Sequence, residues 1–164
     1  MPKKIDPINR KNYGAVSVAL TVADIPAAAK FYQQAFGFTK RNSMNGPDGK
    51  PMHAELVLRG TVVMLSPEAP QRRMLSAKNA GASPTSLYLL TENVDKVVAK
   101  AVKLGATAQG PVMDMFWGDR WGTVIDPEGY IWSIATHMAE PTPQEMKKKM
   151  KEQMSSSSAT AASQ

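Results

Sequence analysis

His53 and Glu55 are the residues whose types and spacing best suit proton transfer. They lie two positions apart at the start of a segment, 53–59, whose apolar residues alternate as in a half-buried strand. Side chains two apart on a strand share one face, so the imidazole and the carboxylate could exchange a proton or hold one end of a ligand. The same spacing fits a solvent-facing pair at the rim of a sheet, and the sequence leaves both interpretations open.

An aromatic tract, 113–121, carries the second set of candidate residues. It contains Phe116, Trp117, Arg120 and Trp121 with no regular period. Aromatic rings on a loop can stack on a planar ligand, and an arginine can pair with a ligand anion. In the alternative interpretation, the tryptophans hold the loop together and Arg120 forms an internal ion pair.

Two series of strands and helices must position these residues. Asp24 precedes the first apolar helical stripe as an N-cap would, and Asn93 or Glu92 precedes the second; Gly37 and Gly105 follow the two stripes. His137, the other histidine of the chain, lies just past the last predicted strand and is expected at the surface. Strands are predicted at 16–22, 53–59, 61–66, 85–90, 120–125 and 130–136, and the second helix at 94–104.

The two series repeat at a fixed offset of 69 residues. The matching pairs are Ser17 with Ser86, Leu20 with Leu89, Asp24 with Asn93, and Ile25 with Val94. A repeated unit of this length indicates repeated supersecondary structure. The sequence therefore predicts an α+β fold in a single domain, 14–140, whose two βαβββ units, 14–68 and 83–138, form one curved mixed sheet with the helices on its outer face.

Strand periodicity assigns the concave face of that sheet. The alternating apolar residues, Trp132 among them, are expected to face the helices, so their neighbours face the other way. The concave face is then an apolar pocket with few polar groups, suited to a small organic molecule. Its predicted residues are Ser17, His53, Glu55, Met64, Ser86, Tyr88 and Ser133.

Three motifs resemble those of the glyoxalase/bleomycin-resistance/dioxygenase superfamily, also called the vicinal oxygen chelate superfamily. The segment 20–37 resembles its first strand and helix, and Asp126-Pro127-Glu128-Gly129-Tyr130 its last hairpin. The tract 116–122 resembles one found in a bacterial glyoxalase-like branch. The likeness spans residues 14–138.

This resemblance implies four metal-ligand positions, which Ser17, Met64, Ser86 and Ser133 occupy here. Hydroxyls and a thioether are poor ligands for the divalent cations of such enzymes, so we expect no metal and no cofactor. The resemblance then implies a binding protein of the bleomycin-resistance type. The alternatives are a metal-independent isomerase- or lyase-like enzyme that uses His53 and Glu55, and a metalloenzyme with relocated ligands.

The two ends of the chain carry most of its formal net charge of +6. A basic arm, 1–13, and a lysine-rich amphipathic helix, 142–154, flank a nearly neutral body, so we expect no nucleic-acid partner. The tail, 155–164, is low-complexity and predicted to be disordered. We expect a homodimer, because the methionine stripe of the helix needs a surface to contact. The chain has no cysteine, no secretory signal and no apolar run long enough for a membrane, so a cytoplasmic location and no membrane partner are predicted.

Overall fold

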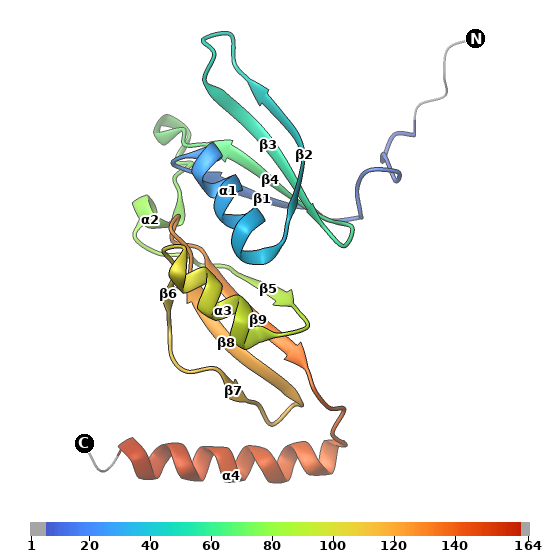
Figure 1. Ribbon diagram of the computed structural model, residues 1–164, viewed down its shortest axis with the longest axis vertical. Helices are drawn as coiled ribbons and strands as arrows, with labels where there is room; N and C mark the ends of the chain where they lie inside the picture. Colours follow the sequence, from blue (N-terminus) through green and yellow to red (C-terminus); the bar gives the residue numbers. More distant parts are fainter. Residues whose placement is uncertain (1–5, 162–164) are drawn as a thin grey trace.

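Each half of the chain folds into a small sheet with one helix packed against it (Figure 1). The structure is a computed structural model and describes residues 6–161. The first unit consists of β1 (Val18–Val22), α1 (Ile25–Phe36), β2 (Thr39–Asn45), β3 (Pro51–Leu58) and β4 (Thr61–Pro67). The second consists of β5 (Ser86–Leu90), α3 (Val94–Lys103), β6 (Thr107–Ala108), β7 (Met113–Asp114), β8 (Asp119–Ile125) and β9 (Ile131–His137). The predicted α+β class is confirmed.

The two main helices begin and end at the residues that the sequence indicated. The Asp24 carboxylate accepts a hydrogen bond from the Ala27 amide, and the Asn93 side chain accepts one from the Lys96 amide. Gly37 ends α1 in a left-handed conformation, with φ of 82°. Each helix packs on one face of its own sheet, and α1 and α3 also contact each other (Figure 1).

Strand order and register confirm the internal repeat. The first sheet has the order β1-β4-β3-β2 and the second β5-β9-β8-β6, with β7 also paired to β8. In each sheet the first strand runs parallel to the last one of its unit. Val18 lies opposite Val63 in the first sheet, and Leu87 lies opposite Trp132 in the second, so both members of the pair shift by 69 residues.

The strands form two hydrogen-bonded sheets instead of the single continuous sheet that was expected. β1 and β5 each lie at an edge, and no backbone pairing joins them within residues 6–161. Side chains take up backbone acceptors at these edges: the Tyr130 hydroxyl donates to the Thr21 carbonyl at 2.7 Å, and Arg59 donates to the Leu90 carbonyl. An acceptor that is already bonded to a side chain does not recruit a neighbouring strand.

A buried aromatic and acidic cluster joins the two units. The Trp132 ring lies 4.5 Å from the Phe36 ring of α1, and its indole nitrogen donates to Asp126 at 2.8 Å. The Tyr32 hydroxyl donates to the same carboxylate at 2.7 Å. Burial raises the pKa of Asp126, although these hydrogen bonds act in the opposite direction and lower it. Trp132 therefore belongs to the core, as strand periodicity predicted.

The turn after Asp126 extends this junction to the start of α1. The Glu128 carboxylate accepts a hydrogen bond from the Ala23 amide at 2.7 Å, and the Glu128 carbonyl accepts one from the Lys78 amide. A carboxylate near a helix N-terminus is favourable because the free amides there carry partial positive charge. The linker that contains Lys78 forms a short turn of 3₁₀-helix (Pro70–Arg72) and α2 (Ala77–Ala80).

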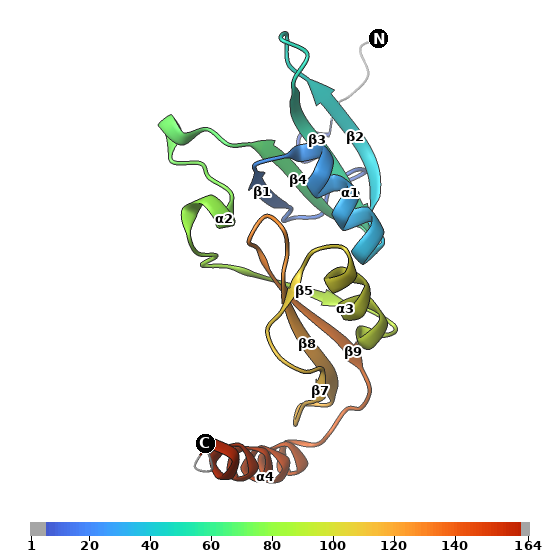
Figure 2. The same cartoon turned by 60° about the vertical axis from the view of Figure 1, so that its left-hand side comes forward.

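The C-terminal helix α4 (Pro143–Ala161) crosses the far end of the second unit (Figure 2). Its capping box is formed as predicted, since Glu145 accepts from the Thr142 amide and Thr142 accepts from the Glu145 amide. The helix passes beyond residue 154, where the sequence predicted a disordered tail; extending a helix already nucleated costs little. Residues 1–5 and 162–164, from the two predicted terminal segments, lie outside the described residues. No helix in the described part of the chain is long and apolar enough to cross a membrane.

Candidate functional site

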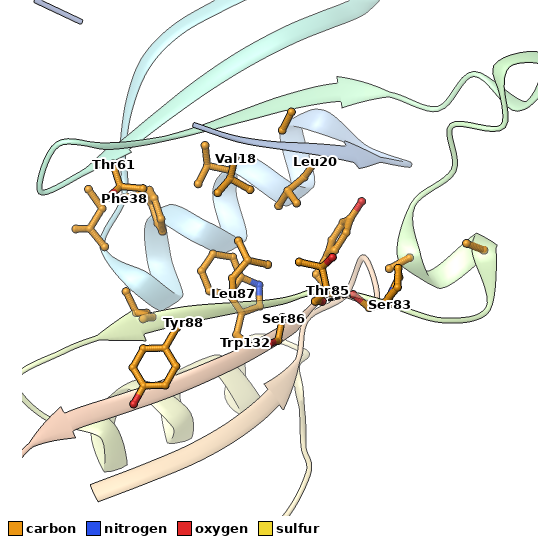
Figure 3. Close-up of a pocket in the computed structure, with 18 of the residues that line it drawn as sticks. Val18, Leu20, Phe38, Thr61, Ser83, Thr85, Ser86, Leu87, Tyr88 and Trp132 are labelled. Atoms are coloured by element: carbon orange, nitrogen blue, oxygen red, sulfur yellow. Dashed lines mark hydrogen bonds between the residues drawn. The ribbon is translucent and has the colours of Figure 1, made fainter. Parts of the chain in front are cut away.

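A cavity of about 870 Å³ lies between the edge strands β1 and β5, where the two units face each other (Figure 3). The linker with α2 forms a further wall. Figure 3 shows Val18 and Leu20 of β1 opposite Leu87 of β5, with Thr61 toward one end and Ser83 and Thr85 toward the other. The lining is mainly apolar and comprises Val18, Ala19, Leu20, Phe38, Leu58, Arg59, Thr61, Val63, Leu75, Ala77, Ala80, Ala82, Ser83, Pro84, Thr85, Ser86, Leu87, Tyr88, Leu89, Leu90, Tyr130 and Trp132.

The polar groups of this cavity are hydroxyls and one guanidinium. No aspartate, glutamate or histidine is among the described residues that line it. The Tyr130 hydroxyl is bonded to the first sheet and the Ser83 hydroxyl donates to the Thr85 carbonyl at 2.6 Å, whereas the Arg59 guanidinium lies at the end near Leu90. The walls therefore offer apolar contact and a few hydrogen-bonding groups, but no acid–base pair.

Ser86 and Tyr88 are the predicted site residues that line this cavity. Both are exposed on β5. The Tyr88 ring points to the other side of the strand in Figure 3, and its hydroxyl donates to Asp119 at 2.8 Å. Burial, and then the Asp119 carboxylate, raise the pKa of Tyr88. Tyr88 therefore contributes its backbone and the base of its side chain to the cavity.

His53 and Glu55 lie on the first sheet, away from the cavity. Their side chains share a face, as predicted, but the His53 Nε2 atom is 3.5 Å from the nearest Glu55 oxygen. The Glu55 carboxylate accepts two hydrogen bonds from Arg41, at 3.0 and 2.9 Å, and another from the Tyr13 hydroxyl. Burial opposes ionisation of Glu55, yet the hydrogen bonds from Tyr13, Arg41 and His53 hold its pKa below the usual value. Glu55 is thus an ion-paired carboxylate rather than a base near neutrality.

The four positions that correspond to metal ligands fall into two pairs, one in each unit. Met64 lies opposite Ala19 of β1, which comes two residues after Ser17, and Ser133 lies opposite Tyr88 on the same face as Ser86. Only Ser86 of the four lines the cavity. Three hydroxyls and a thioether do not fit a divalent-cation site. Within residues 6–161, no three His, Cys, Asp or Glu side chains form an alternative metal-binding group.

Arg120, a predicted ligand-site residue, forms internal ion pairs and does not line the cavity. β8 directs this side chain toward the helix side, where it donates to both Asp95 oxygens of α3 at 2.8 Å and to Asp114 at 2.9 Å. The hydrogen bonds that Arg120 donates to Asp95 and Asp114 raise the pKa of Arg120 further above its usual value. The alternative interpretation, an internal ion pair, is therefore confirmed. The physical reason is strand alternation, which places residues 120 and 121 on opposite faces.

The aromatic residues of the tract contact one another rather than the cavity. The Trp117 ring lies edge-on to Phe116 at 4.9 Å and to Trp121 at 6.4 Å. The Trp117 indole nitrogen donates to Asp119 at 3.1 Å. None of the three rings lines the large cavity. Their stacking on a ligand remains a prediction for the open face of the second sheet.

Asp119 and His137 form a pair that the sequence reasoning missed. The His137 Nδ1 atom is 2.9 Å from an Asp119 oxygen, and Tyr88 and Trp117 donate to the other oxygen. Burial opposes a charged Asp119, but these hydrogen bonds lower its pKa, and Asp119 in turn raises the pKa of His137. The pair can hold a proton on the imidazole, although neither residue lines the cavity. The feature of the sequence that would have predicted this pair is the register of the β8–β9 hairpin, which places residue 119 opposite residue 137.

The comparisons with known proteins agree with this architecture. The family model of the Glyoxalase/Bleomycin resistance protein/Dioxygenase superfamily matches residues 14–134. An uncharacterized protein of Mycobacterium bovis is 34% identical over 142 residues, which cover 85% of this chain and 93% of that protein.

Solved structures show the same fold. A gene product of Arabidopsis thaliana has a TM-score of 0.62 and 25% identity, covering 75% of this chain and 98% of that one. A glyoxalase/bleomycin resistance protein/dioxygenase family enzyme of Burkholderia phytofirmans has a TM-score of 0.59 and 24% identity, covering 74% and 97%. The chain therefore belongs to the glyoxalase/bleomycin resistance protein/dioxygenase superfamily.

Proposed function

We propose that this protein binds a small, largely apolar organic molecule in the cavity between β1 and β5. The observation that carries the proposal is a cavity of about 870 Å³ with mainly apolar walls and, among the described residues, no carboxylate or imidazole. Cavities of roughly 300–1,000 Å³ with apolar walls and a few polar groups are typical of small-molecule sites. A site that binds a ligand without catalysis needs only apolar contact and a few hydrogen-bonding groups, and these walls provide both.

The composition of the walls also supports binding over the enzyme alternative. Catalysis by proton transfer needs an acid or base within reach of the ligand. His53 and Glu55 lie outside the cavity, and Glu55 is already bonded to Arg41 and Tyr13. The donor set at the four metal-equivalent positions does not fit a divalent cation, so no step is assigned to a metal.

Titration with the uncharged fluorophore N-phenylnaphthylamine tests the proposal, because this probe becomes fluorescent in apolar surroundings. Thr85 lies immediately before β5, two residues before Leu87, so strand alternation directs its exposed side chain to the cavity side, and Thr85→Phe places a ring there. We expect this variant to bind the probe about tenfold more weakly or worse, since the ring takes up space that the ligand needs.

Thr107→Phe is the matched control, because Thr107 is also an exposed threonine, on the edge strand β6, but lies outside the cavity. This variant should bind the probe as the wild-type protein does. Both variants should keep the wild-type far-ultraviolet circular dichroism. The proposal fails if the wild-type protein does not enhance probe fluorescence up to the solubility limit of the probe, or if Thr85→Phe and Thr107→Phe bind it equally well.

A further inference from the structure

Arg59 occupies a backbone conformation that arginine seldom adopts. It forms the tip of the β3–β4 hairpin with Gly60, and the two residues have positive φ values of 46° and 82°. A two-residue hairpin turn with positive φ at both positions usually carries Asn or Asp followed by Gly. A non-glycine residue in this region is uncommon, and such residues concentrate at functional sites.

The position of Arg59 connects two hollows of the surface. Its guanidinium donates to the Leu90 carbonyl at the end of β5, so the side chain spans the gap between the units at one end of the apolar cavity. It also lines a second, open cleft of about 770 Å³ beside the N-terminal arm. The residues of this basic cleft are Arg10, Lys11, Asn12, Tyr13, Gly14, Thr39, Arg41, Val57, Arg59 and Gly60.

The basic cleft has an excess of positive charge. It contains four cationic side chains and, among the described residues, no acidic one. Arg10 is paired with Asp6, and Arg41 with Glu55. Neither Lys11 nor Arg59 forms an ion pair with a carboxylate of residues 6–161. Of these two cations, Arg59 lines both hollows, so its uncompensated charge lies where the cleft meets the apolar cavity.

The geometry points to an organic anion as the ligand, with its apolar body in the cavity and its carboxylate, phosphate or sulfonate group at Arg59. This inference rests on the proposed binding at the cavity. A guanidinium has five N–H donors, and the bond to Leu90 uses one of them, so donors remain for an anionic group. Charge at the rim avoids the cost of burying an ion among Val18, Leu20 and Leu87, which line the cavity farther in.

Two fluorophores that share an aromatic skeleton test this inference: anilinonaphthalene sulfonate, which is anionic, and N-phenylnaphthylamine, which is neutral. At low ionic strength, we expect the wild-type protein to bind the sulfonate about tenfold more tightly. Arg59→Asn removes the charge with a residue that accepts positive φ, and it should abolish the preference, measured as the ratio of the two affinities, in which any change of the cavity wall felt by both probes cancels. Arg59→Lys should restore most of the preference.

Arg72→Asn is the matched control, because Arg72 is an exposed arginine in the linker that lines neither hollow. It should keep the wild-type preference, and added salt should reduce that preference in both proteins. If neither probe binds, the proposed function itself fails. If both probes bind but the sulfonate is not preferred, or if Arg59→Asn and Arg72→Asn keep an equal preference, the inference about the anion is overturned and binding in the cavity stands.

Discussion

Replacement of Trp132 tests whether the two units are held together by one packed junction. Trp132 is 2% exposed and contacts the rings of Phe36 and Tyr32 on α1, at 4.5 and 5.4 Å. Removal of such a ring leaves a cavity in the core, so Trp132→Ala should lower the free energy of unfolding by roughly 3–5 kcal/mol. That is a large part of the roughly 5–15 kcal/mol that stabilises a typical domain.

Trp132→Phe separates packing from hydrogen bonding at the same position. Phenylalanine keeps most of the aromatic contact but loses the indole N–H that bonds Asp126 at 2.8 Å. The Asp126 carboxylate retains the Tyr32 hydroxyl and the amides of Glu128 and Tyr130. We therefore expect a smaller loss, about 1–2 kcal/mol.

Urea denaturation followed by far-ultraviolet circular dichroism measures these losses without depending on tryptophan fluorescence. Trp117→Ala is the control, since Trp117 is half-buried on a loop of the second unit; it should cost less than Trp132→Ala. A loss below about 1 kcal/mol for Trp132→Ala would refute the packed junction. Equal losses for the Ala and Phe variants would show that the hydrogen bond, and not the packing, stabilises it. Trp132 also lines the cavity, so its variants are unsuitable as controls for binding.

Three further predictions concern ionisation, metal content and assembly. The Asp119 contact raises the pKa of His137, so this contact should stabilise the fold fully below the unfolded-state pKa of about 6.5 and lose its effect as pH rises through the folded-state pKa. His137→Gln should therefore reduce the pH dependence of the melting temperature between about pH 5.5 and 8.5. An unchanged pH dependence in this variant would contradict the assignment. Elemental analysis should find no stoichiometric zinc, nickel, manganese or iron, and chelation should leave the melting temperature unchanged, whereas a full equivalent of metal would point to ligands other than Ser17, Met64, Ser86 and Ser133. The sequence predicts a homodimer, which would cover some of the exposed apolar side chains of Val16, Met44, Met52 and Met150; a monomer at tens of micromolar by light scattering would rule that out.

Local signals in the sequence were sufficient for the elements and the repeat. Asp24 and Asn93 cap their helices through side-chain hydrogen bonds, an effect of one residue on amides three positions away. Strand alternation assigned Leu87 and Trp132 to the core side, since successive side chains point to opposite faces. The constant 69-residue offset followed from the same local patterns, and the resemblance of the motifs gave the family.

The tertiary structure alone decided how the two units meet and where the cavity lies. β1 and β5 do not pair within residues 6–161; instead, Tyr130 and Arg59 bind carbonyl groups of these edge strands from distant positions, and no local pattern reports such contacts. Strand alternation placed His53 and Glu55 on one face, but it did not predict the hydrogen bonds that Arg41 and Tyr13 donate to the Glu55 carboxylate. The sequence also did not predict the hydrogen bond from Arg59 to the Leu90 carbonyl, because a hairpin tip is expected to face solvent and the second unit supplies this carbonyl. Contacts between residues far apart in sequence depend on the packing of whole units, which local propensity does not encode.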